Sequence, residues 1–281
     1  MPDYNPTETF VTPNPATPAF AHYLAGLTRA KITGVFVERN AGQLVMVMKN
    51  MDQFPDPHKH KVRLVTATKC CGKCANNAAA ITGGLRCKED NIEAEANSFA
   101  ADIQVEKVVS ESRFADLIVL DAKMSFDAEH KKMLSDFTKA VLSRSECPVI
   151  IAPYAFHGIE EIIFAYDGSS SAVFAIKQFS HLFPSLAEKK LTVLQINCTG
   201  DAPVKHKEEI GALLQLQYSN IGFDSITGEP SNALHAYLLQ KTAAIVVMGA
   251  FGENIFASTS RPSTAEPLIK TSTLPLFIAH H

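Results

Sequence analysis

The sequence predicts an α/β fold made of two tandem, doubly wound, Rossmann-like domains. Three observations lead to this prediction. Short apolar runs have the pattern of buried parallel strands, helix-type segments lie between them, and the second half of the chain repeats runs of the first half. Strands that alternate with helices form right-handed βαβ units around a parallel sheet.

Seven apolar runs are predicted to be strands. They are apolar almost throughout, as in parallel strands that are buried on both faces of a sheet. The first half contains the runs 31–38, 115–122 and 147–154, and the second half contains 161–168, 190–197, 243–250 and 274–281.

Two segments of the second half have the pattern of amphipathic helices. The segment 169–183 begins on Ser169 and the segment 231–242 begins on Ser231, and serine is a favoured N-cap residue. Apolar residues recur at helical spacing in both segments. They are Ala172, Phe174, Ala175, Phe179 and Leu182 in the first, and Leu234, Leu238 and Leu239 in the second.

The two halves match each other at nearly fixed offsets. The run ADLIVLDA at 115 matches AAIVVMGA at 243, and PVIIAP at 148 matches PLFIAH at 275, so these two offsets differ by only one. The tripeptide KIT at 31 matches KLT at 190, which is a larger offset, so the first half carries about 31 extra residues between 39 and 90. Each repeat has the size of a domain, with predicted boundaries 1–155 and 160–281. The extra residues include LVMVM and VRLVT, which are either two short strands or parts of a long irregular loop.

Composition and charge argue against two classes of partner. The chain has 281 residues, a net charge of −3 and 46% hydrophobic residues, as in a globular protein with sizeable cores. No basic block marks a nucleic-acid surface, and no apolar run approaches the roughly 18 residues of a membrane span. The Pro-rich, acidic start lacks the features of a signal peptide, so we expect a cytoplasmic protein with reduced cysteines.

Two loops of the second half follow strand ends, where an open parallel sheet binds its ligands. In YDGSSS, Asp167 ends a strand, Gly168 turns the chain and Ser169 opens a helix. In MGAFGENIF, Gly249 and Gly252 follow an apolar run. Small residues let backbone N–H groups approach phosphate oxygens, and a helix N-terminus favours anions. The glycines therefore indicate either a nucleotide site or only the shape of a turn.

The segments IIFAYDGSSSAVFAI and AAIVVMGAFG, followed by LPLFIAHH, resemble the universal stress protein family. The resemblance covers roughly 8–154 and 160–281. It implies a tandem, UspA-like member with a five-stranded parallel sheet in each domain. Paired domains of this family often meet through their last strands, here PVIIAPY and PLFIAHH, which implies a pseudo-twofold axis within one chain.

The nucleotide-binding members of the family carry an acidic residue at the end of the first strand. After the fourth strand they carry G-x-x-G, nine residues and then G-[ST]. Asp167 matches the acidic residue, Gly249 and Gly252 match G-x-x-G, and Ser263 matches the final hydroxyl. The resemblance implies at most one site for ATP or another nucleotide, formed by Asp167, Gly168, Ser169, Gly249, Gly252 and Ser263.

Parts of the chain depart from the family pattern. Pro262 stands where the second glycine motif begins, and proline has no N–H to donate to a phosphate. Glu253 follows Gly252, and its carboxylate repels a triphosphate. In the first half, ADLIVLDAKMSF is followed by no glycine and TFVTPNPATPAF supplies no acid at the turn. We expect the first half to be a structural partner of the second.

A cluster of cysteines and histidines in the first half supports a different hypothesis. Cys71 and Cys74 form a C-x-x-C motif, and the candidate metal ligands are Cys71, Cys74, Cys87, His58 and His60. Tetrahedral zinc needs four convergent ligands of these types. A thiol beside Lys73 at a helix start can have a lowered pKa, which suits redox chemistry. Ordinary reduced thiols at a helix start are the third interpretation.

Three functions remain open from the sequence. The first is a non-enzymatic stress-response binding module with a nucleotide and a protein partner. The second is a metal- or thiol-dependent sensor, and the third is a slow ATP hydrolase, which the incomplete glycine motif disfavours. Association of the chain as a homodimer stays open beside the pairing of its own domains.

Overall fold

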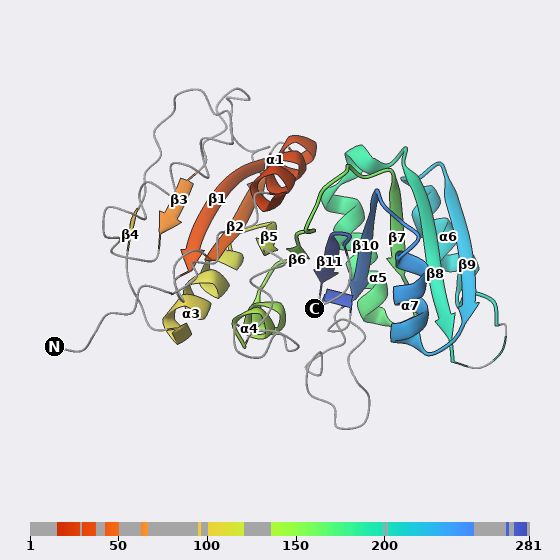
Figure 1. The fold of residues 1–281 in the computed structure, drawn as a ribbon. Coiled ribbons are helices and arrows are strands. Elements are labelled where there is room, and N and C mark those ends of the chain that lie inside the picture. Colours follow the sequence, from red (N-terminus) through yellow and green to blue (C-terminus); the bar gives the residue numbers. More distant parts are fainter. Residues whose placement is uncertain are drawn as a thin grey trace.

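The structure is a computed structural model of the 281-residue chain. It describes residues 16–28, 30–37, 43–50, 63–66, 95–96, 101–120, 136–198, 200, 202–249, 268–269 and 273–279. Within these residues the strands form one 11-stranded sheet, with the strands of the first half on one side and those of the second half on the other (Figure 1). The sheet order is β4-β3-β1-β2-β5-β6-β11-β10-β7-β8-β9.

All seven predicted strands are present, and so are the two extra strands. Those of the first half are β1 (Ala30–Val37), β2 (Gln43–Asn50), β3 (Arg63–Thr66), β4 (Glu95–Ala96), β5 (Leu117–Leu120) and β6 (Val149–Ile151). Those of the second half are β7 (Glu161–Ala165), β8 (Lys190–Asn197), β9 (Ile221–Thr227), β10 (Ala244–Gly249) and β11 (Leu276–Ala279). The interpretation of LVMVM and VRLVT as strands is therefore confirmed.

Helices cover both faces of the sheet. The described helices are α1 (Ala16–Thr28), α3 (Ala101–Ser112), α4 (Asp136–Arg144), α5 (Ser170–Leu182), α6 (Lys207–Gln215) and α7 (Pro230–Leu238), with a 3-10 turn, η2 (Pro184–Leu186). Residues of α1, α5 and α6 pack in one hydrophobic cluster, and residues of α3, α4 and α7 pack in another. In the described part of the chain, none of the helices has both the length and the apolar character that crossing a membrane requires.

The second half is the doubly wound parallel sheet that the sequence predicts. Its five strands lie in the order β11-β10-β7-β8-β9, and every neighbouring pair among them is parallel. The chain moves outward in one direction from β7 through β8 to β9, and in the other direction from β10 to β11. The topological switch point therefore lies between β7 and β10, where open α/β sheets bind their ligands.

The first half differs from the predicted five-stranded parallel sheet. It contains six described strands, and β2 lies between β1 and β5 and runs antiparallel to both. The other neighbouring pairs of this half are parallel. Only five residues separate β1 from β2, which is too short for the crossover that a parallel neighbour needs. A short apolar strand so close behind β1 can pair with it only as a hairpin.

The strand register places β2 where the second half has β7. In the second half, Ile162 of β7 lies between Leu191 and Ile245. The matching sequence runs make Ile32 the first-half counterpart of Leu191, and Leu117 the counterpart of Ile245. Met48 of β2 lies between Ile32 and Leu117 in the same way. The strand β2 therefore occupies the position of β7 but runs in the opposite direction.

The two halves meet through their last strands, as predicted. The strands β6 and β11 are antiparallel, and Ile150 pairs with Phe277, its counterpart in the match of PVIIAP with PLFIAH. On either side of this pair, Val149 faces Ile278 and Ile151 faces Leu276. The same match makes Val149 the counterpart of Leu276 and Ile151 the counterpart of Ile278, so the register is self-complementary. This is the pattern of a pseudo-twofold axis.

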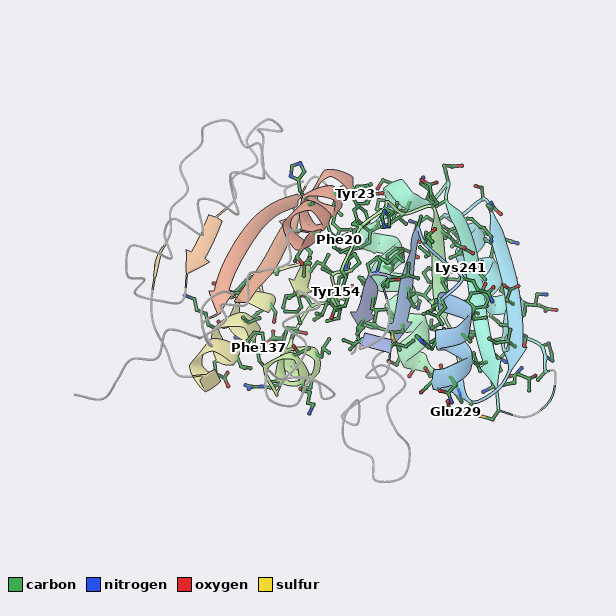
Figure 2. The ribbon with its side chains drawn as sticks, in the orientation of Figure 1. Phe20, Tyr23, Phe137, Tyr154, Glu229 and Lys241 are labelled. Carbon is green, nitrogen blue, oxygen red and sulfur yellow. The ribbon has the colours of Figure 1, made fainter. Side chains whose placement is uncertain are left out.

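Side chains of α1 extend the contact between the halves. Phe20 and Tyr23 face the middle of the molecule (Figure 2), where their ring centroids lie 4.9 and 4.8 Å from that of Phe156, in the segment that links the halves. The hydroxyl of Ser185 donates to the carbonyl of Leu27 at 3.2 Å. Phe20 belongs to the same buried cluster as residues of α5 and α6, so one hydrophobic core spans both halves.

Candidate functional site

The candidate site lies at the carboxyl edge of the second half, where β7 and β10 end side by side. The last residues that pair between these strands are Ala165 and Met248. Asp167 follows β7 by two residues and Gly249 ends β10. The sequence interpretation required these two strands to be neighbours, and their pairing brings the Asp167 turn and the end of β10 to one edge.

The turn from Asp167 to Ser169 is held by its own side chains. The carboxylate oxygen Oδ1 of Asp167 accepts from the backbone N–H of Ser169 at 2.8 Å. Gly168 has a φ of +83°, which favours glycine because it has no Cβ. The hydroxyl of Ser169 accepts from the N–H of Ala172 at 3.1 Å and caps α5. The predicted start of the helix at Ser169 is confirmed.

Gly249 allows the end of β10 to pack directly on the first turn of α5. A Cβ placed on Gly249 would lie 2.5 Å from the carbonyl carbon of Ser171 and 2.6 Å from the nitrogen of Ala172. These are backbone atoms, so a side chain there would force the strand and the helix apart. Gly249 therefore has a packing role that holds whether or not a ligand binds.

Lys205 lies across the Asp167 turn, and the sequence interpretation missed it. Its ammonium Nζ donates to the carbonyl oxygen of Asp167 at 3.1 Å. Its side chain also covers Gly168, because a Cβ placed on Gly168 would lie 2.9 Å from Cδ of Lys205. In the segment KHKEE, Lys205 lies two residues before the start of α6. No local sequence pattern indicates its contact with Asp167, which lies 38 residues earlier in the chain.

A buried amide fixes the backbone of Lys205. Gln195 of β8 is only 2% exposed, and its Oε1 accepts from the N–H of Lys205 at 2.8 Å. Its Nε2 donates to Oδ1 of Asn197 at 2.8 Å and to the carbonyl of Pro203 at 3.2 Å. Asn197 in turn donates to the hydroxyl of Ser225 on β9. The loop after β8 is thus tied to two strands.

The charges around the turn are mixed. Burial raises the pKa of Tyr166, and the carboxylates of Asp167 and Glu209 raise it further. Lys205 supplies a positive charge at the backbone carbonyl of Asp167. The N-terminus of α7 lies at the same edge, where Glu229 (Figure 2) caps it by accepting from the N–H groups of Ser231 and Asn232. The cap of α5 is the neutral Ser169, and the carboxylate of Asp167 accepts from the N–H of Ser169 at the same helix start.

Several predicted site residues lie outside the described residues. They are Gly252, Ser263, Cys71, Cys74, Cys87, His58 and His60. The completion of the glycine motif and the zinc and redox interpretations therefore stay predictions. Among the residues with described side chains, no group of three or more histidine, cysteine or acidic residues could hold a metal ion.

Comparison with known proteins identifies the fold. No protein-family model matches the chain, and no curated protein matches its sequence. A universal stress protein of Archaeoglobus fulgidus matches 78% of this chain and 86% of its own, with 18% identity and a TM-score of 0.52. A putative universal stress protein of Pseudomonas aeruginosa matches 79% of this chain and 83% of its own, with 15% identity and a TM-score of 0.46. The universal stress protein UspA of Lactobacillus plantarum matches 44% of this chain and 98% of its own, with 15% identity and a TM-score of 0.31.

The likeness to the Archaeoglobus protein confirms the predicted fold class. The chain has the α/β, Rossmann-like fold of a universal stress protein over most of its length. At 18% identity this likeness concerns the fold alone.

Proposed function

We propose that this chain is a tandem universal stress protein, a non-enzymatic binding module with one nucleotide site in its second half. The proposed units are 1–155 and 160–281, which the self-complementary register of β6 and β11 supports. The observation that carries the nucleotide site is the meeting of the Asp167 turn, the start of α5 and Gly249 at the switch point of a parallel sheet.

Each part of this arrangement suits a phosphorylated nucleoside. The N-terminus of α5 favours an anion through its dipole and its N–H groups. The second carboxylate oxygen of Asp167 can accept from ribose hydroxyls while Oδ1 holds the turn. Gly249 carries no side chain, so the end of β10 can lie directly against the first turn of α5 at this edge of the sheet. ATP is the ligand that the resemblance of the sequence favours.

The first half offers no equivalent of this arrangement among its described residues. The strand at the position of β7 is β2, and it runs in the opposite direction. Because β2 is reversed, it begins at the carboxyl edge of the sheet and ends at the amino edge. It therefore cannot lead through a turn into a helix at the carboxyl edge. We therefore propose that the first half acts as the permanent structural partner of the second.

The experiment is thermal unfolding with and without millimolar Mg-ATP. A ligand at about 100 times its dissociation constant stabilises by about 2.7 kcal/mol, which raises the Tm by several degrees. The same shift should be lost in Asp167→Ala and retained in Glu188→Ala, an exposed acid near the opposite edge. An absent shift in the unmodified protein would exclude the site. An equal shift in Asp167→Ala would place the nucleotide elsewhere.

A further inference from the structure

Lys205 has contacts that a purely solvated surface lysine would not have. Its ammonium donates to the carbonyl of Asp167, and its methylene groups cover Gly168. The backbone of the same residue is fixed by Gln195, a side chain that is 2% exposed. Lys205 therefore joins the loop after β8 to the loop after β7, two segments that are adjacent only in the folded sheet.

Without this contact the Asp167 turn depends on local bonds. One of them is the bond from the Ser169 N–H to the Asp167 carboxylate, and Gly168 can adopt many backbone conformations. A carboxylate that must meet a ligand needs its own backbone fixed, because binding groups have to be held near their productive geometry. Lys205 supplies that restraint from outside the turn.

We propose that Lys205 is a positioning residue for the nucleotide site: it locks the Asp167–Gly168 turn so that the Asp167 carboxylate is presented to the ligand. This inference rests on the proposed function, since it assigns a role within that site. Gln195 is the residue that places Lys205, through the hydrogen bond to its backbone N–H. The ammonium acts through Asp167 and does not itself hold the phosphates.

The test uses Lys205→Met, with Lys207→Met as the matched control. Methionine keeps the apolar chain over Gly168 and the backbone N–H for Gln195, so only the ammonium is lost. Lys207 lies two residues away, and its ammonium lies 5.2 Å from the ring of Phe223 instead of the turn. Both lysines are exposed, so we expect the Tm without ligand to change by no more than about 1 °C in either variant.

The first measurement needs no ligand. Hydrogen exchange followed by mass spectrometry reports the opening of the peptide that spans 166–171. Loss of the ammonium contact should make exchange in this peptide about fivefold faster in Lys205→Met, and leave it unchanged in Lys207→Met. Unchanged exchange in Lys205→Met would overturn the proposed restraint, whatever the protein binds.

The second measurement is the affinity for Mg-ATP at two salt concentrations. Lys205→Met should bind about fivefold to tenfold more weakly, by the same factor at low and high salt, because the turn is loosened and no phosphate contact is lost. A loss that disappears at high salt would mean that the ammonium touches the phosphates, and would overturn the positioning role. Equal affinities would also overturn it. If the unmodified protein binds no ATP, the proposed function fails and this role falls with it.

Discussion

Gly249 illustrates how one residue joins two elements. Its Cα lies so close to the backbone of Ser171 and Ala172 that no side chain fits between β10 and α5. The glycine is required by packing, and the same closeness brings the end of β10 to the start of α5. Its packing role and its proposed binding role are two results of one close approach.

We predict that Gly249→Ala destabilises the protein by about 2 kcal/mol, because the new methyl group meets backbone atoms that cannot rotate away. Chemical denaturation by urea measures this change. Gly26→Ala is the control, since nothing lies within 4 Å of a Cβ there and alanine favours a helix by about 1 kcal/mol. A Gly249→Ala variant as stable as the unmodified protein would contradict the close approach.

The two described cysteines should differ sharply in reactivity. Burial raises the pKa of the Cys147 thiol to about 12, and the charges of Asp116 and Glu146 add to the effect. At pH 8 only about one thiol in ten thousand is then ionised. We predict that iodoacetamide alkylates the exposed Cys198 in the native protein and spares Cys147, as mass spectrometry of the peptides would show. Alkylation of both at similar rates would contradict the buried position of Cys147.

At the scale of elements, an ionic cluster joins β7, β8 and the end of α7 at the amino edge of the sheet. The Glu161 carboxylate accepts from Lys190 and Thr192 through Oε1, at 2.9 and 3.0 Å, and from Lys241 through Oε2, at 2.8 Å. Burial acts to raise the pKa of Glu161, but these hydrogen bonds outweigh it and hold the pKa below the ordinary value of 4.5. The cluster stabilises the amino edge, while the proposed binding residues lie at the carboxyl edge.

We predict that Glu161→Gln destabilises the protein by about 2 kcal/mol at pH 7, because the two ammonium groups lose their anion. The pKa of Glu161 is lower in the folded chain, so its stabilising contribution is complete above about pH 4.5 and is lost as the pH falls further. Urea denaturation at pH 7, 5 and 3 should show the difference between the two proteins shrinking towards pH 3. Glu188→Gln, at an exposed acid, is the control. A difference that does not depend on pH would contradict the charged cluster.

The sequence predicts most elements because each carries its own local pattern. The apolar runs of β7, β8, β10 and β11 and the serine cap of α5 are local signals, and all of them proved correct. The strand LVMVM was also recognisable, but its position between β1 and β5 was not, because sheet order depends on contacts distant in sequence. Lys205 was missed for the same reason, since its partner Asp167 lies 38 residues away. The offsets between the repeats are the exception, because residues that they match hold equivalent places in the sheet.

At the scale of the whole molecule, one core joins the halves. The seam between β6 and β11 is buried, and Phe277 packs on Phe179 and Phe183 with ring centroids 5.3 and 6.4 Å away. Phe20 of α1 belongs to the same cluster. Neither half can therefore lose its structure without exposing apolar surface of the other, and we expect the two to unfold together.

We predict that Phe20→Ala lowers the free energy of unfolding by about 3–5 kcal/mol in both halves, since the ring is fully buried in the shared core. Hydrogen exchange of the slowest amides in β5 and β8 should show the same loss in each strand. Phe114→Ala is the control, because Phe114 is 72% exposed. A loss confined to β5 would mean that the halves unfold independently.

The number of nucleotides bound per chain tests the central claim most directly. Isothermal titration of the full chain with Mg-ATP measures that number. Because β2 replaces β7 in the first half and only the second half has the Asp167 turn beside Gly249, we predict one ATP per chain, lost in Asp167→Ala. Two ATP molecules per chain would contradict the structural role of the first half, and none would contradict the nucleotide site itself.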